Sequence, residues 1–432
     1  MNKKAHWKKR LALALSAGFL VLHTSAVMAA PVELSLNDSI MMALQNNPTI
    51  KIADADRKSA ELGIDVAKVY KVPSFSLTHS DNRYKAYSSG NSYITNYSSN
   101  EIAMNLPLYT GGKAEAELKK AKLGLKSADL GVEKSKQQIQ LDATTSYFTI
   151  LQTINAMKVS EESVDMMVAH LKNVQAQYGV GVVAKSDVLR SEVELASYEQ
   201  KKIIAYNNYA LAVSKFNNVV GLPLETEIKV NEELQHTKYE LPLEDSIKYA
   251  MVNRPEALQA DYAIEVAKQS VTSAQSDNLP HLSVGAKTGW SDDKFPGNDN
   301  NTWSVGVSAT WNAFDSGVTN AKVKQSNSAV VKATEQAKQT KDAIQLEVRQ
   351  AYLNMNEADK RIGTTQVAVE KAEEDFKISG VRYSAGVGTN IDVIDAQVAL
   401  TQAKNNYIQA MYDYNTSKAN LVKAMGMPIG NK

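Results

Sequence analysis

The feature that most constrains this chain is a very long segment with the heptad pattern of a packed α-helix. It runs from Gly112 to Tyr178, 67 residues, which as a helix would extend roughly 100 Å. Seven-residue spacing drives coiled-coil packing, and a single eleven-residue step relaxes its winding. A helix this long exceeds what an ordinary globular domain needs. The apolar positions are Leu118, Leu125, Val132, Ile139, Ile150, Met157, Val164, Leu171 and Tyr178.

The same segment returns later in the chain as part of a larger duplication. Tyr178 corresponds to Tyr383, an offset of 383 − 178 = 205 residues. Near the start of each copy, "LNDSIMMALQNNP" corresponds to "LEDSIKYAMVNRP". We therefore predict two structural repeats, residues 30–224 and 241–432, joined by a polar linker over residues 225–240. Each repeat should contain a short helix, a helix that begins at a proline, a β-hairpin, the long helix and a final helix.

Residues 1–29 are typical of a secretory signal peptide. Five basic residues precede a mostly apolar stretch, Leu11 to Leu22, and small residues precede a cut near Ala29. This stretch is too short to serve as a membrane-spanning anchor. Cleavage would change the net charge from +1 to +1 − 5 = −4. The remaining chain therefore has no basic excess, and nucleic acid is not an expected partner.

The sequence offers no pattern of catalytic or metal-binding residues. It contains no cysteine, which excludes thiol catalysis. The four histidines after residue 29 are scattered without the spacing of metal ligands. We therefore predict a protein that is not an enzyme and that uses no metal or cofactor. Those histidines are His79, His170, His236 and His281.

Two segments, about 74–110 and 281–315, alternate apolar and polar residues as strands of a β-hairpin do. Alternating strands with polar loops suit an outer-membrane sheet, although a soluble hairpin that caps the helices is an alternative. All tryptophans after residue 29 lie in the second segment, as an interfacial aromatic belt would require: Trp290, Trp303 and Trp311. The predicted apolar faces comprise Phe75 and Leu77; Ile102, Met104, Leu106 and Leu108; Leu282, Val284 and Ala286; and Val305, Val307 and Ala309.

Four strands cannot close a barrel, and an open sheet edge cannot face lipid. A membrane barrel would therefore require several copies of the chain. Eight strands leave little lumen, so three chains that supply twelve strands are the simplest route to an open pore.

Four short segments lie where the predicted strands lead into the long helices and where those helices end. They are "NLPLYTGGKAEAELKKA" (Asn105 to Ala121), "WNAFDSGVTNAKVKQS" (Trp311 to Ser326), "YGVGVVAKSDV" and "YSAGVGTNIDVIDA". The first two resemble the passage from strand to long helix, and the last two the helix turns, of the TolC-like outer-membrane efflux proteins, or outer membrane factors. The resemblance covers about residues 34–429. It implies a mainly α fold with a small β part, in which duplicated long-helix hairpins form an α-barrel tunnel and four strands per chain contribute to a trimeric twelve-stranded β-barrel.

The resemblance also implies a place and a function. A homotrimer would sit in the outer membrane of a diderm bacterium, contact its lipid, and extend into the periplasm. There it would dock onto a periplasmic adaptor and an inner-membrane pump, and serve as an exit duct for efflux or type I secretion. The alternative is a structural coiled-coil protein that links the outer membrane to the periplasm without conducting.

The two turns are the predicted functional site. Glycine tolerates the left-handed backbone that a reversal needs, and acids near a helix N-terminus are favourable. Ser186 could cap the following helix only in the first copy. By resemblance, one set of turn residues receives the adaptor: Val180, Gly181, Val182, Val183, Ala184, Ala385, Gly386, Val387, Gly388 and Thr389. A second set lines the channel entrance: Asp187, Tyr383, Asp392 and Asp395. The arginine that helps lock this entrance in the family is replaced here by Gly388.

Overall fold

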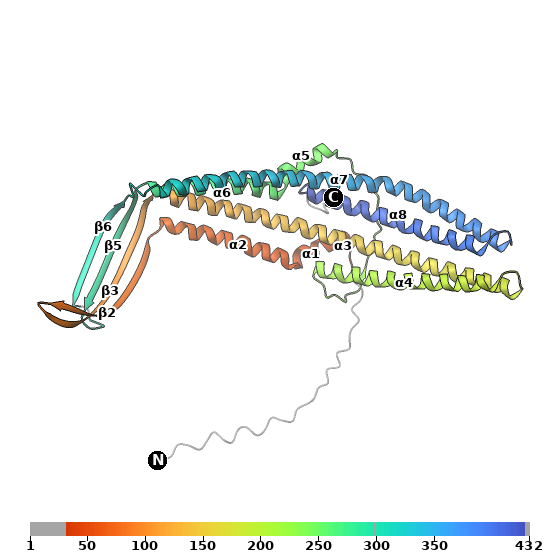
Figure 1. Cartoon of the computed structure of the whole chain (residues 1–432), viewed down its shortest axis with the longest axis horizontal. Helices are drawn as coiled ribbons and strands as arrows, with labels where there is room; N and C mark the ends of the chain where they lie inside the picture. Colours follow the sequence, from red (N-terminus) through yellow and green to blue (C-terminus); the bar gives the residue numbers. More distant parts are fainter. Residues whose placement is uncertain (1–31, 298, 428–432) are drawn as a thin grey trace, which may run out of the picture.

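The computed structural model describes residues 32–297 and 299–427, so the predicted signal peptide lies outside the described residues. The molecule is elongated, with a β-sheet at one end and two helix turns at the other (Figure 1). Two helices connect these ends, α3 (Lys113–Gly179) and α7 (Val318–Ser384), each of 67 residues. The prediction of two very long helices, one in each copy, is confirmed.

Shorter helices pack beside α3 and α7 in two sets. On the sheet side lie α2 (Pro48–Lys68) and α6 (Pro255–Gln275), and each begins with the predicted proline. Toward the turns lie α4 (Lys185–Val220) and α8 (Asn390–Ala424), which return antiparallel to α3 and α7. Since α3 also contacts α6 and α8, the two copies form one continuous layer of helices.

The two sets of shorter helices meet end to end near the middle of the molecule. There α1 (Leu36–Asn46) and α5 (Leu243–Asn253) precede α2 and α6. The Asn47 side chain caps α2 and donates to the carbonyl of Val219, 3.0 Å away in the last turn of α4. In the second copy, buried Arg254 donates to the carbonyl of Ala424, 2.9 Å away at the end of α8. These contacts satisfy helix-end carbonyls that would otherwise have no partner.

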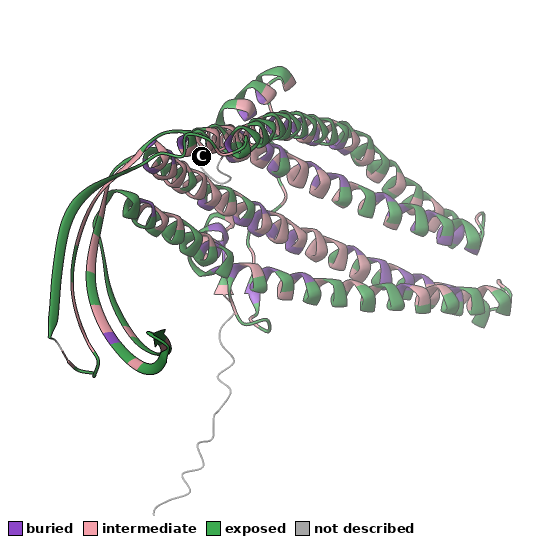
Figure 2. Cartoon of the chain, turned by 60° about the vertical axis from the view of Figure 1, so that its left-hand side comes forward, coloured by how far each residue is buried: buried purple, intermediate pink, exposed green. Residues whose placement is uncertain are grey.

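Most of the apolar core lies around these junctions. One cluster joins α1, α3 and α4 around the fully buried Tyr147 and Phe216. The other joins α5, α7 and α8 around Tyr414. Figure 2 shows buried residues along the contact sides of the helices, whereas the described strands of the sheet are exposed or partly buried, with Ser98 as their one buried residue. The linker includes β4 (Ile228–Lys229), which pairs in parallel with β1 (Val32–Glu33).

The four long strands form one antiparallel sheet in the order β2-β3-β5-β6. Their bounds are Ser74–Ser88 for β2, Asn91–Thr110 for β3, His281–Asp292 for β5 and Asn300–Thr310 for β6. One-turn 3-10 helices, Val69–Lys71 and Ser276–Asn278, lead from α2 and α6 into the sheet.

Two residues depart from the predicted strand alternation. A register shift between Pro107 and Tyr109 places Tyr109, rather than Leu108, opposite Leu282. An extra residue in one strand causes such a shift, which alternation alone does not reveal. Trp311 follows β6 instead of belonging to it, and its indole N–H donates to the Asn278 carbonyl, 3.1 Å away. None of the described helices is long and apolar enough to cross a membrane.

Candidate functional site

Both helix turns use the same hydrogen-bonded design. In the first, the N–H of Val182 donates to the carbonyl of Gln177 and that of Gly181 to Tyr178, both at 2.9 Å. In the second, Val387 donates to Arg382 and Gly386 to Tyr383, both at 3.0 Å. This pair of bonds is the Schellman motif, which requires a left-handed residue just after the helix. Gly181 and Gly386 occupy that position, with φ of 77° and 75°.

The other two turn glycines, Gly179 and Gly388, do not have left-handed backbone. Gly179 is the last residue of α3 and has an ordinary helical place. Gly388 also lacks a positive φ, but a Cβ atom there would lie 3.0 Å from the Tyr383 nitrogen and 3.1 Å from the Cβ of Arg382. Gly388 therefore allows close packing against the end of α7 and does not supply left-handed backbone.

The predicted adaptor-docking residues divide into exposed and inward-facing groups. Val180, Val182 and Val387 project into solvent with 76%, 67% and 67% of their surface exposed. Val183 instead packs against a small apolar cluster made by Val174, Tyr383 and Val393 with Val188 and Phe376. Ala184, Ala385 and Thr389 are exposed and flank the turns. The turns thus present isolated apolar side chains above a hydrogen-bonded and packed base.

The helix cap occurs in the opposite copy from the predicted one. Thr389 and Asp392 form a capping box at the start of α8, with the Thr389 N–H 2.9 Å from the Asp392 carboxylate. Hydrogen bonds from the backbone and side chain of Thr389 hold the pKa of Asp392 below its usual value. In the first copy α4 begins after Ala184 without a side-chain cap, and Ser186 does not act as one. Its position, one residue inside the helix, explains the failure.

The predicted entrance acids do not form one cluster within the chain. Asp392 and Asp395 are exposed and three residues apart on α8, so they share a helix face. Asp187 is half-buried in the first turn of α4, on the other hairpin. Arg382 reaches across its turn toward the Val387 carbonyl, 3.5 Å away, and its charge also lowers the pKa of Asp392. A cation therefore lies near this turn although Gly388 cannot supply one.

A buried polar cluster joins the two helix hairpins, α3 with α4 and α7 with α8, just behind their turns. The Asn390 side-chain oxygen lies 2.7 Å from Nε2 of His170 on α3 and accepts from Ser191 on α4 at 3.2 Å. The Asn390 amide donates to the Asp187 carbonyl at 3.1 Å. All three side chains are buried. One side chain at the start of α8 thus binds two helices of the other copy.

Tyr383 sits beside this cluster, and here the two copies differ. Its ring centroid is 5.2 Å from that of His170. Tyr383 is 3% exposed, whereas the corresponding Tyr178 is 45% exposed. Burial, and to a lesser degree the charge of Asp187, raises the pKa of Tyr383. The hydroxyl has no hydrogen-bond partner in the described chain. Tyr383 was predicted at this site. His170, Ser191 and Asn390 were not, because each is an unremarkable polar residue within a helical pattern.

A second candidate region is the sheet, whose two faces have opposite character. Cross-strand pairing places the predicted apolar residues of all four strands on one face, Leu108 and Trp311 excepted. Many are exposed, including Phe75, Leu77, Val305 and Val307. The opposite face is polar and carries an ion pair between Lys287 and Glu101 at 3.3 Å. An apolar surface this extensive marks a contact with lipid or with another protein.

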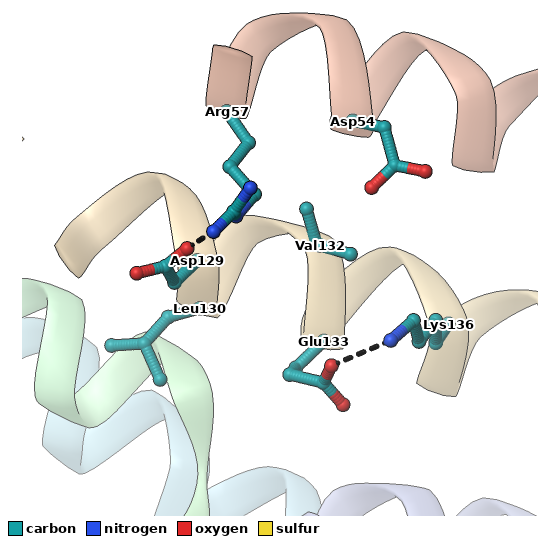
Figure 3. Close-up of a pocket in the computed structure, with 7 residues that line it drawn as sticks. All are labelled: Asp54, Arg57, Asp129, Leu130, Val132, Glu133 and Lys136. Atoms are coloured by element: carbon teal, nitrogen blue, oxygen red, sulfur yellow. Dashed lines mark hydrogen bonds and ion pairs between the residues drawn. The ribbon is translucent and has the colours of Figure 1, made fainter. Parts of the chain in front are cut away.

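A charged hollow between α2 and α3 contains none of the predicted site residues. Figure 3 shows Arg57 of α2 bound to Asp129 of α3 at 2.6 Å, with Asp54 nearby. Glu133 and Lys136 pair within α3 at 2.8 Å. The hollow has a volume of about 340 Å³. Its ion pair between Arg57 and Asp129 joins the two helices at the surface. No group of three His, Asp or Glu side chains among the described residues could hold a metal ion.

Comparison with known proteins identifies the family. The family model described as "Outer membrane efflux protein" matches residues 39–222 and 247–427. The chain belongs to the outer membrane efflux protein family. It is 25% identical to the outer membrane protein TolC of Escherichia coli, with 91% of this chain and 83% of the relative covered. It is 22% identical to the alkaline protease secretion protein AprF of Pseudomonas aeruginosa, with coverages of 96% and 88%.

Solved structures agree with this assignment. The fold matches the CmeC outer membrane channel of Campylobacter jejuni with a TM-score of 0.81 at 17% identity, covering 92% of this chain and 87% of that one. The predicted fold of duplicated long-helix hairpins with a four-stranded sheet is therefore confirmed. As a member of the outer membrane efflux protein family, the chain is an outer-membrane channel protein of the efflux and secretion class.

Proposed function

We propose that three copies of this chain form an exit duct that crosses the outer membrane and continues into the periplasm as a helical tunnel. The sheet carries this proposal. Its exposed apolar face suits lipid, and the small or polar residues of its other face, such as Ser283, Gly285 and Ser304, suit a water-filled interior. The two outer strands of the sheet, β2 and β6, each have one unpaired edge within the described chain.

The unpaired edges support assembly into a ring. In hydrocarbon, an open sheet edge leaves backbone groups without hydrogen-bond partners. Because strand direction alternates across the sheet, β6 of one copy can pair antiparallel with β2 of the next, and repetition closes a ring. Two copies would give eight strands, whose interior side chains fill, whereas three would give twelve and leave a passage.

The tryptophans support the placement of this sheet in the membrane. Trp290 and Trp303 lie on the apolar face at its end far from the helices, and Trp311 lies at the end near them. Eight residues of extended chain separate Trp303 from Trp311, about 26 Å. The apolar band of an outer-membrane sheet is ~25 Å tall and is bordered by aromatic residues on both sides. A strand tilt of about 40° would shorten the projected height to about 20 Å.

The exposed turns support docking of a periplasmic adaptor that connects the duct to an inner-membrane pump. Val180, Val182 and Val387 are apolar and project from the end of the molecule farthest from the membrane. Side chains of this kind fit between the apolar residues of an amphipathic helical partner. In a trimer, Asp392 and Asp395 of each chain would then line the entrance, and this ring of carboxylates would favour cations.

Conductance of the purified protein in a planar bilayer tests the duct. We expect stable single-channel currents from a species whose mass, determined by native mass spectrometry, corresponds to three copies. A trimer that inserts into the bilayer but carries no current would contradict the duct and favour a non-conducting coiled-coil linker.

Charged substitutions at the turns test docking separately. Val182→Asp and Val387→Asp place charge on exposed positions without disturbing the glycines, so the trimer should still insert and conduct. Export in cells and co-purification of the adaptor should be lost. Val252→Asp is the matched control, since Val252 is 70% exposed at the end of α5, away from the turns. Normal export by both turn variants would refute docking at these residues.

A further inference from the structure

The hairpin of β2 and β3 is longer than the rest of the sheet. Pairing between β3 and β5 stops at Ser98, whereas β2 and β3 continue to pair through residues 82–88 and 91–97. At 3.3 Å per residue this two-stranded ribbon, residues 82–97, extends about 23 Å past its neighbour and forms the end of the molecule farthest from the helices (Figure 1). An isolated two-stranded ribbon is only marginally stable in water, so a surface that covers one of its faces would stabilise it.

The two faces of the ribbon differ in charge. Register places Arg83, Lys85 and Tyr87 on one face. All three are exposed, and the Lys85 ammonium lies 5.3 Å from the centre of the Tyr87 ring. Arg83 makes no ion pair with any described residue, and the nearest acid on this face, Asp81, is bound to His79 at 3.1 Å. The other face is uncharged and carries Tyr84, Tyr93 and Tyr97.

The cationic face continues the apolar face of the sheet. Alternation along β2 puts Phe75, Leu77 and Arg83 on the same side, because they are separated by even numbers of residues. On this side Trp290 and Trp303 mark the far end of the apolar region. Strand pairing aligns Trp290 with His79 through Asn100, so Arg83 stands four residues, about 13 Å, beyond the outer aromatic belt. If the sheet lies in the membrane, as the proposed function requires, the ribbon's cations therefore lie outside this belt, on the side of the glycolipid headgroups and their phosphates.

We propose that Arg83, Lys85 and Tyr87 bind the phosphate groups of glycolipid headgroups in the outer leaflet. A guanidinium presents paired donors that match phosphate oxygens, and a lysine adds a point charge. The hydroxyl of Tyr87, two residues farther out than Lys85, can donate to a phosphate oxygen. Asp292, at the end of β5 on the same face, is an opposing charge at the base of the ribbon and not along it. A second ribbon is a poor occupant of this face, because like charges would meet.

The experiment compares glycolipids that differ only in phosphate. The purified protein is placed in phosphatidylcholine nanodiscs with traces of bisphosphorylated lipid A or of the same lipid without phosphates, and native mass spectrometry counts the retained glycolipid at low salt. Wild-type protein should prefer the phosphorylated lipid. The double variant Arg83→Gln/Lys85→Gln should lose about 25-fold in that preference, since each cation near an anionic surface is worth about fivefold.

A matched variant removes the same charge elsewhere. Lys332→Gln/Lys338→Gln changes two exposed lysines of α7 and should leave the preference unchanged. Equal retention of both lipids by wild type, or equal losses in the two variants, would overturn the inference. Efficient disulfide formation between copies of Tyr87→Cys would do so too, because it would show that a second ribbon covers this face. Conductance of the same preparation separates the two proposals: a conducting protein without phosphate preference refutes the lipid site alone.

Discussion

The Asn390 side chain offers the sharpest test of how the two hairpins are held together. The variant Asn390→Leu keeps a similar volume but removes three hydrogen bonds, to His170, Ser191 and the Asp187 carbonyl. A buried bond of this kind contributes about 1 kcal/mol net. Loss of all three should therefore destabilise the packing of the two helix hairpins against each other by about 3 kcal/mol. Since each 1.4 kcal/mol is a factor of ten, local opening at the turns should become about a hundredfold more frequent.

Hydrogen exchange followed by mass spectrometry measures this opening. Peptides over the first turns of α4 and α8 should exchange about a hundredfold faster in Asn390→Leu, while peptides from the sheet should not change. Asn415→Leu is the control, because Asn415 donates only to the Met411 carbonyl one turn earlier in the same helix. Unchanged exchange at the turns of Asn390→Leu, or equal acceleration in both variants, would show that the cluster does not hold the hairpins together.

Three further predictions concern the same end of the molecule. Burial lowers the pKa of His170, so this side chain is neutral while the two helix hairpins are packed together. As pH falls below about 6.5, the ordinary pKa of histidine, protonation should favour separation of the hairpins at the turns. Hydrogen exchange at the turns should therefore rise on acidification in the wild type and stay constant in His170→Gln. Replacing Asp392 and Asp395 with asparagine should reduce cation selectivity in single-channel recordings, and an unchanged reversal potential would remove the ring of acids. Gly386→Ala should lower the free energy of unfolding by about 1 kcal/mol, because Gly386 has a left-handed φ. Gly380→Ala lies within α7 with open space around it and should raise the free energy of unfolding by up to ~1 kcal/mol.

Features that repeat along the chain could be predicted from the sequence. Heptad spacing from Gly112 and proline at Pro48 and Pro255 predict helices that the structure contains at those bounds. Strand alternation predicts the apolar face of the sheet, because a single side-chain period decides it. The bulge near Leu108 breaks that period locally. Its sign in the sequence is Pro107, because proline cannot donate within a central strand and occurs there at bulges.

Contacts between the two repeats of the chain could not be predicted in this way. His170 and Asn390 are 220 residues apart, and neither belongs to a periodic pattern or a local motif. Their pairing depends on how α3 and α8 are aligned along their length, which tertiary packing sets. The cap at Thr389 is different: the sequence contains threonine three residues before Asp392, the spacing of a capping box, so closer reading of that spacing would have found it.

The unequal burial of Tyr178 and Tyr383 has a consequence for any partner. A ring of three chains would present six turns of nearly identical backbone, yet only alternate turns would carry a buried tyrosine and a capped following helix. A sixfold partner would therefore meet two classes of turn, or seat: one is preorganised and the other is more easily deformed. Such a partner would engage the stiff seats with little loss of conformational entropy, while the compliant seats between them could adjust to its shape.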